Sequence, residues 1–130
     1  MKIKLSSIHV DNQDHALAFY TGVLGFQKSK DIPMGEFRWI TVTSPEGHPD
    51  VELVLEPNAN PTARAYQEGL MEQGIPCTAF EVEDVEAESK RLKESGVKFT
   101  MDPTDVGIVK IAIFADTCGN LLQIYEVKGE

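Results

Sequence analysis

The chain has 130 residues, of which 12 are basic and 21 are acidic, so its formal net charge is −9. This length suits one compact domain, or two half-sized modules that share a core. Nucleic acids and anionic membrane surfaces bind basic stripes or patches, and the sequence has an acidic excess with no such stripe. We therefore expect neither a nucleic acid nor a membrane as a partner.

The N-terminal segment has no apolar run long enough for a signal peptide, and no stretch is long enough to span a bilayer. These features predict a cytoplasmic protein. The two cysteines, Cys77 and Cys118, are then expected to be reduced thiols rather than a disulfide.

The first 57 residues have the pattern of one strand, one helix and three further strands. A strand is expected over residues 5–11, followed by a helix with Asn12 as its N-cap. Gly22 and Gly25 are expected to end this helix. The next three strands, separated by turns rich in Pro and Gly, are predicted over residues 26–32, 37–44 and 51–56.

The second part of the chain follows the same order. Residues 58–75 are predicted to be a linker with a short helix, and residues 77–82 a strand. Asp84 takes the N-cap role of Asn12, and the helix after it is expected to end at Gly96. Three strands are predicted to complete this part, over residues 98–101, 106–115 and 121–126.

The two parts match as an internal repeat. Residues 10–12 align with residues 82–84 at an offset of 72, and residues 51–53 align with residues 122–124 at an offset of 71. We therefore predict an α+β fold of two tandem β-α-β-β-β modules, residues 1–57 and 76–130, in a single domain over 1–130. Each sheet has one face covered by its helix, so the two remaining faces are expected to enclose a cavity within a curved mixed sheet.

Two motifs resemble the vicinal oxygen chelate superfamily, which includes glyoxalases, bleomycin-resistance proteins and extradiol dioxygenases. Residues 10–26 are similar to its pattern V-x-D-x-x-x-A-x-x-F-Y-x-x-x-L-G-F, with Asn12 at the usual Asp. Residues 116–126 are similar to its closing pattern D-P-x-G-N-x-x-E-L-x-E. The resemblance implies the glyoxalase-like fold and a homodimer, and it leaves the reaction open because members of this superfamily differ in chemistry.

The resemblance also implies four positions for metal ligands, which in this chain are Leu5, Glu52, Cys77 and Gln123. Only Glu52 is a usual ligand in its usual place, and no His is present in the set. One carboxylate, one thiol and one amide make a poor site for a hard divalent ion and an incomplete site for zinc. We expect no metal and no other cofactor; the alternative is a weakly held Zn, Ni, Mn or Fe ion.

Glu52 is the candidate catalytic residue. Two-residue alternation places Glu52, Val54 and Glu56 on the cavity side of their strand. Partial desolvation there is expected to raise the pKa of Glu52, which suits a general base. The alternative is a structural carboxylate that is hydrogen-bonded to Gln123.

The other candidate residues are expected to bind the ligand. The resemblance implies that His9 binds an anionic group of the ligand or acts as an acid–base partner of Glu52, and the alternative is a lining residue without a catalytic role. Trp39 either forms an aromatic wall with Phe37 and Tyr125 or packs in the core. Cys77 is either a nucleophile or a small buried apolar residue. The candidate ligand-binding residues are Ser7, His9, Trp39, Glu56, Cys77, Gln123 and Tyr125.

The sequence supports two main functions. The first is a small-molecule binding protein of the glyoxalase/bleomycin-resistance type that lacks the usual metal centre. The second is a glyoxalase-like lyase or isomerase in which Glu52 abstracts a proton. A dioxygenase is a third alternative, but it needs a two-His-one-carboxylate set that the four positions do not supply.

Overall fold

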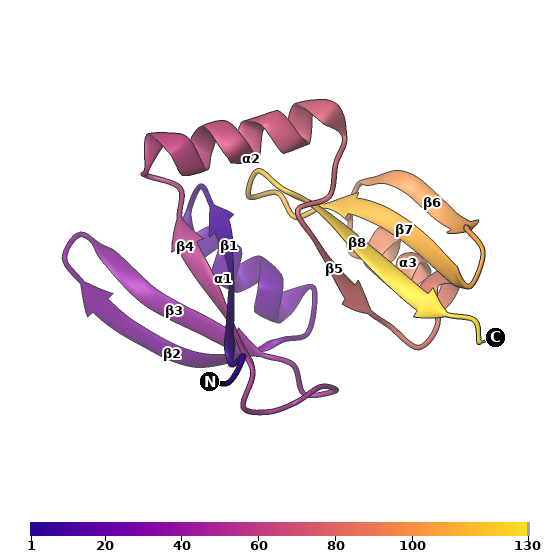
Figure 1. The fold of residues 1–130 in the computed structure, drawn as a ribbon, viewed down its shortest axis with the longest axis horizontal. Coiled ribbons are helices and arrows are strands. Elements are labelled where there is room, and N and C mark those ends of the chain that lie inside the picture. Colours follow the sequence, from indigo (N-terminus) through magenta and orange to yellow (C-terminus); the bar gives the residue numbers. More distant parts are fainter. Residues whose placement is uncertain (130) are drawn as a thin grey trace. The chain divides into compact units, whose positions relative to one another are not determined.

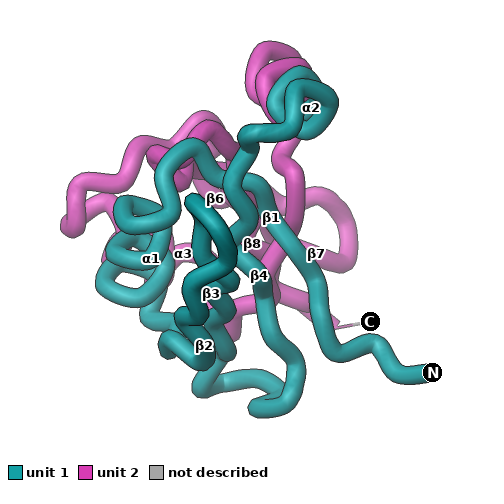
Figure 2. Tube along the Cα trace, turned by 90° about the vertical axis from the view of Figure 1, so that its left-hand side faces the viewer, with its two compact units in different colours: residues 1–66 teal, residues 67–130 magenta. Residues whose placement is uncertain are grey.

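The computed structural model describes residues 1–129, and it forms two units of similar size. Unit 1 comprises residues 1–66 and unit 2 comprises residues 67–130, so the division falls inside the helix α2, Pro61–Gln73 (Figure 2). Each unit contains one four-stranded mixed sheet, and each sheet is open rather than closed into a barrel. The predicted α+β class is confirmed.

Unit 1 has the predicted β-α-β-β-β order (Figure 1). Its sheet has the order β1-β4-β3-β2, with β1 and β4 parallel and the other neighbours antiparallel. Its elements are β1 (Leu5–Val10), α1 (Gln13–Gly22), β2 (Gln27–Met34), β3 (Phe37–Thr43) and β4 (Glu52–Pro57).

Unit 2 repeats this topology strand for strand. Its sheet has the order β5-β8-β7-β6, and again the first pair is parallel and the others are antiparallel. Its elements are β5 (Thr78–Glu81), α3 (Val85–Glu94), β6 (Phe99–Asp105), β7 (Val109–Ala115) and β8 (Leu121–Val127). The predicted pair of modules is therefore confirmed at the level of fold.

The two equivalent helices begin with the same capping interaction. The Asn12 side chain accepts a hydrogen bond from the His15 backbone N–H at 3.0 Å, and Asp84 accepts one from the Ala87 N–H at 3.0 Å. Each cap satisfies one of the backbone donors that a helix start leaves without a partner. Both N-caps lie where the sequence predicted them.

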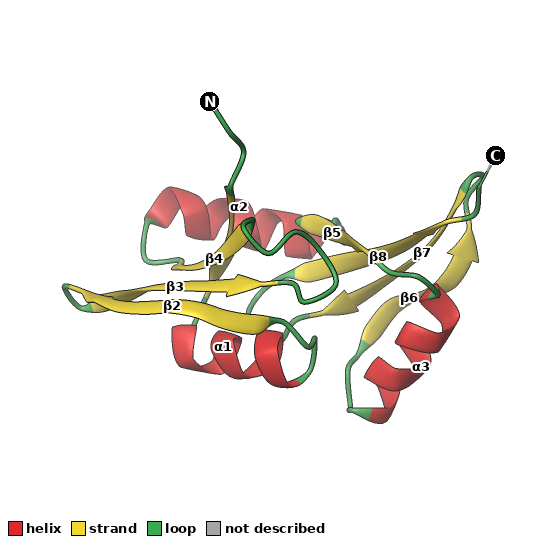
Figure 3. Cartoon of the chain, turned by 90° about the horizontal axis from the view of Figure 1, so that it is seen from below, coloured by secondary structure: helices red, strands yellow, loops and turns green. Residues whose placement is uncertain are grey.

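In each unit one face of the sheet is covered by its own helix (Figure 3). In unit 1 the helix contributes Phe19 and Tyr20, which are buried together with sheet residues such as Ile40 and Leu55. In unit 2 the corresponding buried set comprises Val85, Leu92, Ala112, Phe114, Leu122 and Ile124. These apolar side chains follow the alternation of the strands, so the other face of each sheet is left without a helix of its own.

The closing motif of residues 116–120 forms a tight, buried turn in unit 2. Asp116 Oδ1 accepts hydrogen bonds from the backbone N–H groups of Cys118, at 2.7 Å, and Asn120, at 3.0 Å. Asn120 Nδ2 donates to Asp116 Oδ2 at 2.8 Å. The buried Gln67 side chain of α2 donates to Cys118 O at 3.0 Å and to Asn120 Oδ1 at 3.1 Å. This motif therefore has a structural role, which is to hold α2 on the β7–β8 turn.

The strand boundaries differ from prediction mainly in β6 and β7. A strand was expected over residues 106–115, but β6 extends to Asp105 and β7 begins only at Val109. The turn between them contains Gly107 at φ +96°, and the Val106 N–H donates to Val109 O. Register irregularities in β6 accommodate Pro103, which cannot donate to the ladder.

Among the described residues, no helix combines the length and apolar character needed to cross a membrane.

Candidate functional site

The strand pairing of unit 1 places a group of polar and aromatic side chains on the face of the sheet that α1 does not cover. We call this the open face of unit 1. Leu5 pairs with Glu52 and His9 pairs with Glu56, so the β1 and β4 candidates lie on one side, as the alternation predicted. The open face comprises Leu5, Ser7, His9, Lys30, Ile32, Met34, Phe37, Trp39, Thr41, Glu52, Val54 and Glu56.

Glu52 is held by two side chains from neighbouring strands. Lys30 Nζ of β2 donates to Glu52 Oε2 at 2.7 Å, and Thr41 Oγ1 of β3 donates to Glu52 Oε1 at 2.5 Å. The Lys30 backbone N–H also donates to Thr41 Oγ1 at 3.1 Å. We call these three residues the Lys30–Glu52 cluster; it joins β2, β3 and β4 through polar contacts.

The expected rise in the pKa of Glu52 is wrong. The hydrogen bond from Lys30 lowers this pKa most, the hydrogen bond from Thr41 lowers it further, and together they outweigh the effect of burial. The Glu52 side chain is 17% exposed and that of Lys30 is 47% exposed. Glu52 is therefore an ionised, hydrogen-bonded carboxylate at neutral pH, which makes it a weaker base than predicted.

The part of the open face next to this cluster is apolar and exposed. Trp39 pairs with Ile32, and Phe37 pairs with Met34, so all four side chains lie on the open face. Ile32 is 50% exposed and Met34 is 59% exposed, while Trp39 is partly buried. The register places Trp39 away from α1, so the core-packing alternative against that helix does not hold.

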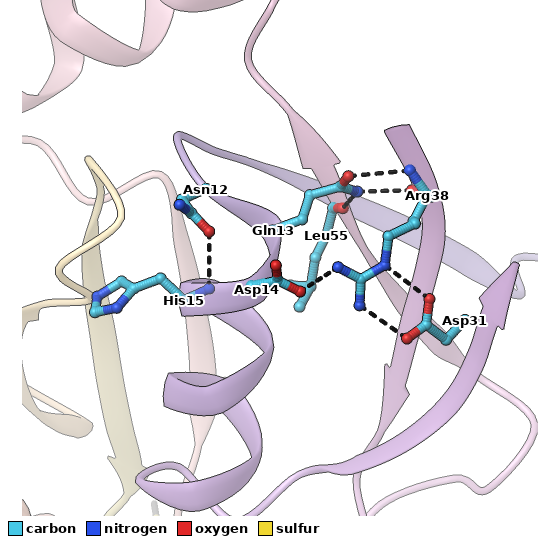
Figure 4. Close-up of polar contacts among 7 residues, drawn as sticks. All are labelled: Asn12, Gln13, Asp14, His15, Asp31, Arg38 and Leu55. Atoms are coloured by element: carbon cyan, nitrogen blue, oxygen red, sulfur yellow. Dashed lines mark hydrogen bonds and ion pairs between the residues drawn. The ribbon is translucent and has the colours of Figure 1, made fainter. Parts of the chain in front are cut away.

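Arg38 is next to Trp39 in β3, so its side chain lies on the opposite face of the sheet. There it contacts the start of α1 (Figure 4). Its guanidinium forms ion pairs with Asp31 of β2, at 2.9 Å, and with Asp14 in the first turn of α1. The hydrogen bonds from Arg38 hold the pKa of Asp31 below its usual range. Arg38 is thus a structural cation on the helix side, whereas Lys30 is a cation on the open face.

Gln13 also fastens α1 to the sheet (Figure 4). Its buried amide donates to Arg38 O at 2.6 Å and to Leu55 O at 2.9 Å, and accepts from the Arg38 N–H at 3.1 Å. These three bonds connect the first turn of α1 to β3 and β4. The helix side of unit 1 is therefore fixed by polar contacts as well as by its apolar core.

His9 and Glu56 form a second polar pair on the open face. His9 Nε2 lies 3.8 Å from Glu56 Oε2, and the two side chains are 36% and 39% exposed. On the two paired strands, the pair Ser7 and Val54 lies between the pair Leu5 and Glu52 and the pair His9 and Glu56. Unit 1 thus brings Ser7, His9, Trp39, Glu52 and Glu56 onto one face.

In unit 2, Gln123 and Tyr125 share the face of the sheet that α3 does not cover. Gln123 pairs with Ala79 of β5 and Ile113 of β7, and Tyr125 pairs with Glu81 and Ile111. Cys77 directly precedes β5, and its N–H donates to Leu121 O at 3.0 Å. Of the predicted ligand-binding residues, unit 2 therefore brings Gln123 and Tyr125 onto one face.

The pairing also corrects the repeat alignment of the last strands. Thr41 and Ile113 are each the fifth residue of their strand and pair with Val54 and Gln123, respectively. Glu52, two residues before Val54, therefore corresponds to Leu121, two residues before Gln123. The offset of 71, which matched Glu52 with Gln123, is wrong for the strand pairing.

The Cys77 thiol is expected to be unreactive in this environment. Burial raises the pKa of the Cys77 thiol to about 11, and the Asp116 carboxylate adds to the rise. The thiol is therefore protonated at neutral pH, whereas nucleophilic attack and metal binding need the thiolate. These contacts favour the small-apolar interpretation of Cys77 over the nucleophile.

The residues at the four implied metal positions do not fit a resident divalent metal. Leu5 has no donor atom, and Glu52 is already neutralised by the Lys30 ammonium. Cys77 is a thiol at neutral pH, and Gln123 offers only a neutral amide. Within residues 1–129, no three His, Cys, Asp or Glu side chains cluster as a metal site would require.

Lys30 and Thr41 are the residues of the cluster that the sequence reasoning missed. The hairpin signal could have found them: a two-residue turn at Gly35 and Glu36 makes Met34 pair with Phe37, and counting back pairs Lys30 with Thr41. The strand before this turn was instead predicted to end at residue 32, which hides this register.

The sequence and the fold are similar to known proteins along almost the whole chain. The family model of the Glyoxalase/Bleomycin resistance protein/Dioxygenase superfamily matches residues 2–124. The chain is 54% identical over 126 residues to the uncharacterized protein YurT of Bacillus subtilis (strain 168), covering 97% of this chain and 99% of YurT.

Many solved structures share the fold, UcmS2 and TnmS3 among them. UcmS2 is 31% identical with a TM-score of 0.83, covering 97% of this chain and 98% of UcmS2. TnmS3, described as an antibiotic binding protein from Streptomyces sp. CB03234, is 27% identical with a TM-score of 0.78. That match covers 98% of this chain and 96% of TnmS3.

Proposed function

The chain belongs to the glyoxalase/bleomycin resistance protein/dioxygenase superfamily, and on that premise we propose that it is a small-molecule binding protein without a resident metal. The proposed ligand is flat and mostly apolar, and it lies against the open face of unit 1. The observation that carries this proposal is the apolar surface around Trp39, which adjoins the Lys30–Glu52 cluster.

The exposure of this surface supports a binding role. Ile32, Met34 and Phe37 are 50%, 59% and 38% exposed, and they are neighbours of Trp39 on two paired strands. Contiguous exposed apolar residues beside polar groups are typical of interaction surfaces, and a flat aromatic ligand stacks well on an indole ring. TnmS3, which has the same fold, is described as an antibiotic binding protein, and this description agrees with the proposal.

The lyase or isomerase alternative receives less support from the geometry. A general base near neutral pH needs a pKa near 7, and Lys30 and Thr41 instead lower the pKa of Glu52. The metal that such an enzyme would use for polarising its substrate lacks a fitting donor set.

The homodimer and the cytoplasmic location remain parts of our proposal, carried by the family resemblance and the sequence.

Trp39 gives a direct test because it is the single Trp of the chain. Its indole N–H therefore gives one indole cross-peak in a ¹H–¹⁵N spectrum. We would titrate the protein with a panel of flat aromatic ketones that have two, three and four fused rings. The expected result is a saturable shift of the Trp39 indole peak, together with backbone shifts in β2 and β3.

A Trp39→Leu variant is the control for this titration. It retains an apolar side chain but removes the flat ring, so the backbone shifts are expected to need at least tenfold more ligand. If no member of the panel shifts the Trp39 indole saturably, or if Trp39→Leu binds as tightly, the open face of unit 1 is not the binding site.

A further inference from the structure

We propose that the Lys30 ammonium takes the place of a divalent cation on the open face of unit 1, and that it donates a hydrogen bond to a carbonyl oxygen of the ligand. This inference rests on the proposed function and specifies the class of ligand: a flat aromatic molecule with a neutral acceptor oxygen at its edge.

The first step is the charge of Glu52. A carboxylate that is 17% exposed needs a counter-charge, and Lys30 Nζ supplies it at 2.7 Å. Leu5, which pairs directly with Glu52, offers no donor that would help to hold a metal. The neutralisation that a bound cation would give is therefore already present in the side chains of unit 1.

The second step is the hydrogen-bonding capacity of Lys30. An ammonium has three N–H donors, and Glu52 is the only hydrogen-bond acceptor of Lys30 Nζ within residues 1–129. The Lys30 side chain is 47% exposed, so its remaining donors are accessible from the open face. Thr41 has no such spare capacity, because its hydroxyl donates to Glu52 and accepts from the Lys30 N–H.

The third step is the position of Lys30 relative to Trp39. Lys30 pairs with Thr41 and Ile32 pairs with Trp39, so Lys30 and Trp39 are diagonal neighbours on one face. Diagonal neighbours on paired strands are about 7–8 Å apart. Lys30 Nζ contacts the same Glu52 carboxylate that accepts from Thr41, so the ammonium lies near Thr41, which is two residues from Trp39 on β3. A ring stacked on Trp39 therefore has its edge within reach of the ammonium.

The charge balance favours a neutral acceptor over an anion. The Lys30–Glu52 pair has no net charge, so an anionic group that approached Lys30 would also approach the Glu52 carboxylate. A carbonyl oxygen accepts the hydrogen bond without that repulsion. The cluster should thus distinguish aromatic ketones from hydrocarbons of the same shape, and it should favour ketones over the matching carboxylates.

The ligand arm of the test uses 9-fluorenone, fluorene and fluorene-9-carboxylate, followed by the Trp39 indole peak. We expect the wild type to bind 9-fluorenone about tenfold more tightly than fluorene, which is the scale of one hydrogen bond to a charged group. The carboxylate should bind more weakly than the ketone. In Lys30→Met the preference for the ketone should disappear, and in Lys30→Arg it should persist.

The cation arm of the test does not depend on any ligand. Leu5→His places an imidazole opposite Glu52, and Ni²⁺ binding is measured by calorimetry with and without Lys30. We expect the double variant Leu5→His/Lys30→Met to bind Ni²⁺ at least tenfold more tightly than Leu5→His alone. Backbone spectra of all variants check that the sheet of unit 1 is retained.

The two arms separate failure of this inference from failure of the proposed function. Equal binding of 9-fluorenone and fluorene at Trp39 would overturn the role of Lys30 while leaving the binding function intact. Equal Ni²⁺ binding by the single and double variants would overturn the idea that Lys30 replaces a cation. Absence of all three probes from Trp39 would overturn the proposed function itself.

Discussion

Units 1 and 2 have the same strand order and the same helix caps, but they differ at matched positions on their open faces. In unit 1, Lys30 pairs with Thr41 and both contact Glu52. In unit 2, the corresponding pair is Met101 and Ile113, and Leu121 occupies the position of Glu52. A charged, hydrogen-bonded cluster in one unit is therefore an apolar cluster in the other.

This difference shows that topology and chemistry depend on separate residues. The topology depends on helix caps, turn residues and alternating apolar positions, which both units share. The chemistry depends on three side chains of the open face, which can change without altering the strand order. A repeat detected from the sequence thus predicts the fold of both units but not the site of either.

The largest expected effect concerns the turn that only unit 2 has. The β3–β4 connection of unit 1 is a longer, mostly exposed loop, whereas residues 116–120 turn tightly beneath Gln67. A Cβ atom at Gly119 would lie 2.6 Å from Gln67 Nε2, and Gly119 has φ +99°. Gly119→Ala should therefore lower the free energy of unfolding by about 2 kcal/mol, measured by urea denaturation.

The double variant Gln67→Ala/Gly119→Ala identifies the cause of that loss. Removing the Gln67 side chain relieves the clash but not the backbone strain, so the two losses should be less than additive. The matched control is Gly47→Ala in the loop of unit 1, where φ is not positive and the nearest atoms belong to Ser44 at 3.3 Å. A Gly119→Ala protein as stable as the Gly47→Ala protein would contradict this account of the turn.

The two helix caps should contribute equally to the free energy of unfolding, because they make the same interaction in both units. Asn12→Ala and Asp84→Ala each remove one side-chain acceptor for a backbone N–H at 3.0 Å. Each substitution should cost about 1 kcal/mol of unfolding free energy. Thermal and urea unfolding of both variants measures this, and costs that differ by more than about twofold would break the equivalence of α1 and α3.

The smallest effect is the pH dependence of the Lys30–Glu52 pair, which has no counterpart at the matched positions of unit 2. The pKa of Glu52 is lowered by Lys30 and Thr41, so its stabilising effect is full above the unfolded pKa of about 4.3 and is lost as the pH falls through the folded pKa. Lys30→Met should therefore destabilise by less than about 1 kcal/mol at pH 7, because Lys30 is half exposed. That difference should shrink below pH 4.

The control for the pH dependence is Met101→Ala in unit 2, where no ionised partner corresponds to Glu52. Its effect on unfolding free energy should be the same at pH 7 and at pH 4. If the effect of Lys30→Met were equally independent of pH, the ion pair of unit 1 would have no energetic role in solution.

The sequence was sufficient for the fold because the signals were local and repeated. The N-caps Asn12 and Asp84 can be predicted from the local sequence without any tertiary contact. The alternation of residues around Glu52 also assigned its side chain to the correct face of the sheet. The Lys30–Glu52 cluster depended instead on the register of the β2–β3 hairpin, which shifts with the exact position of a two-residue turn. Without that register, the lowered pKa of Glu52 could not be predicted from the sequence.

The central claim is that a flat ligand binds on Trp39 with its acceptor oxygen on Lys30. The most direct measurement is a crystal structure of the protein grown with 9-fluorenone. Our account predicts the ring system against the Trp39 indole and the ketone oxygen within hydrogen-bonding distance of Lys30 Nζ, with the Lys30–Glu52 contact retained. A ligand bound away from Trp39, or a ketone oxygen that has no contact with Lys30, would contradict it.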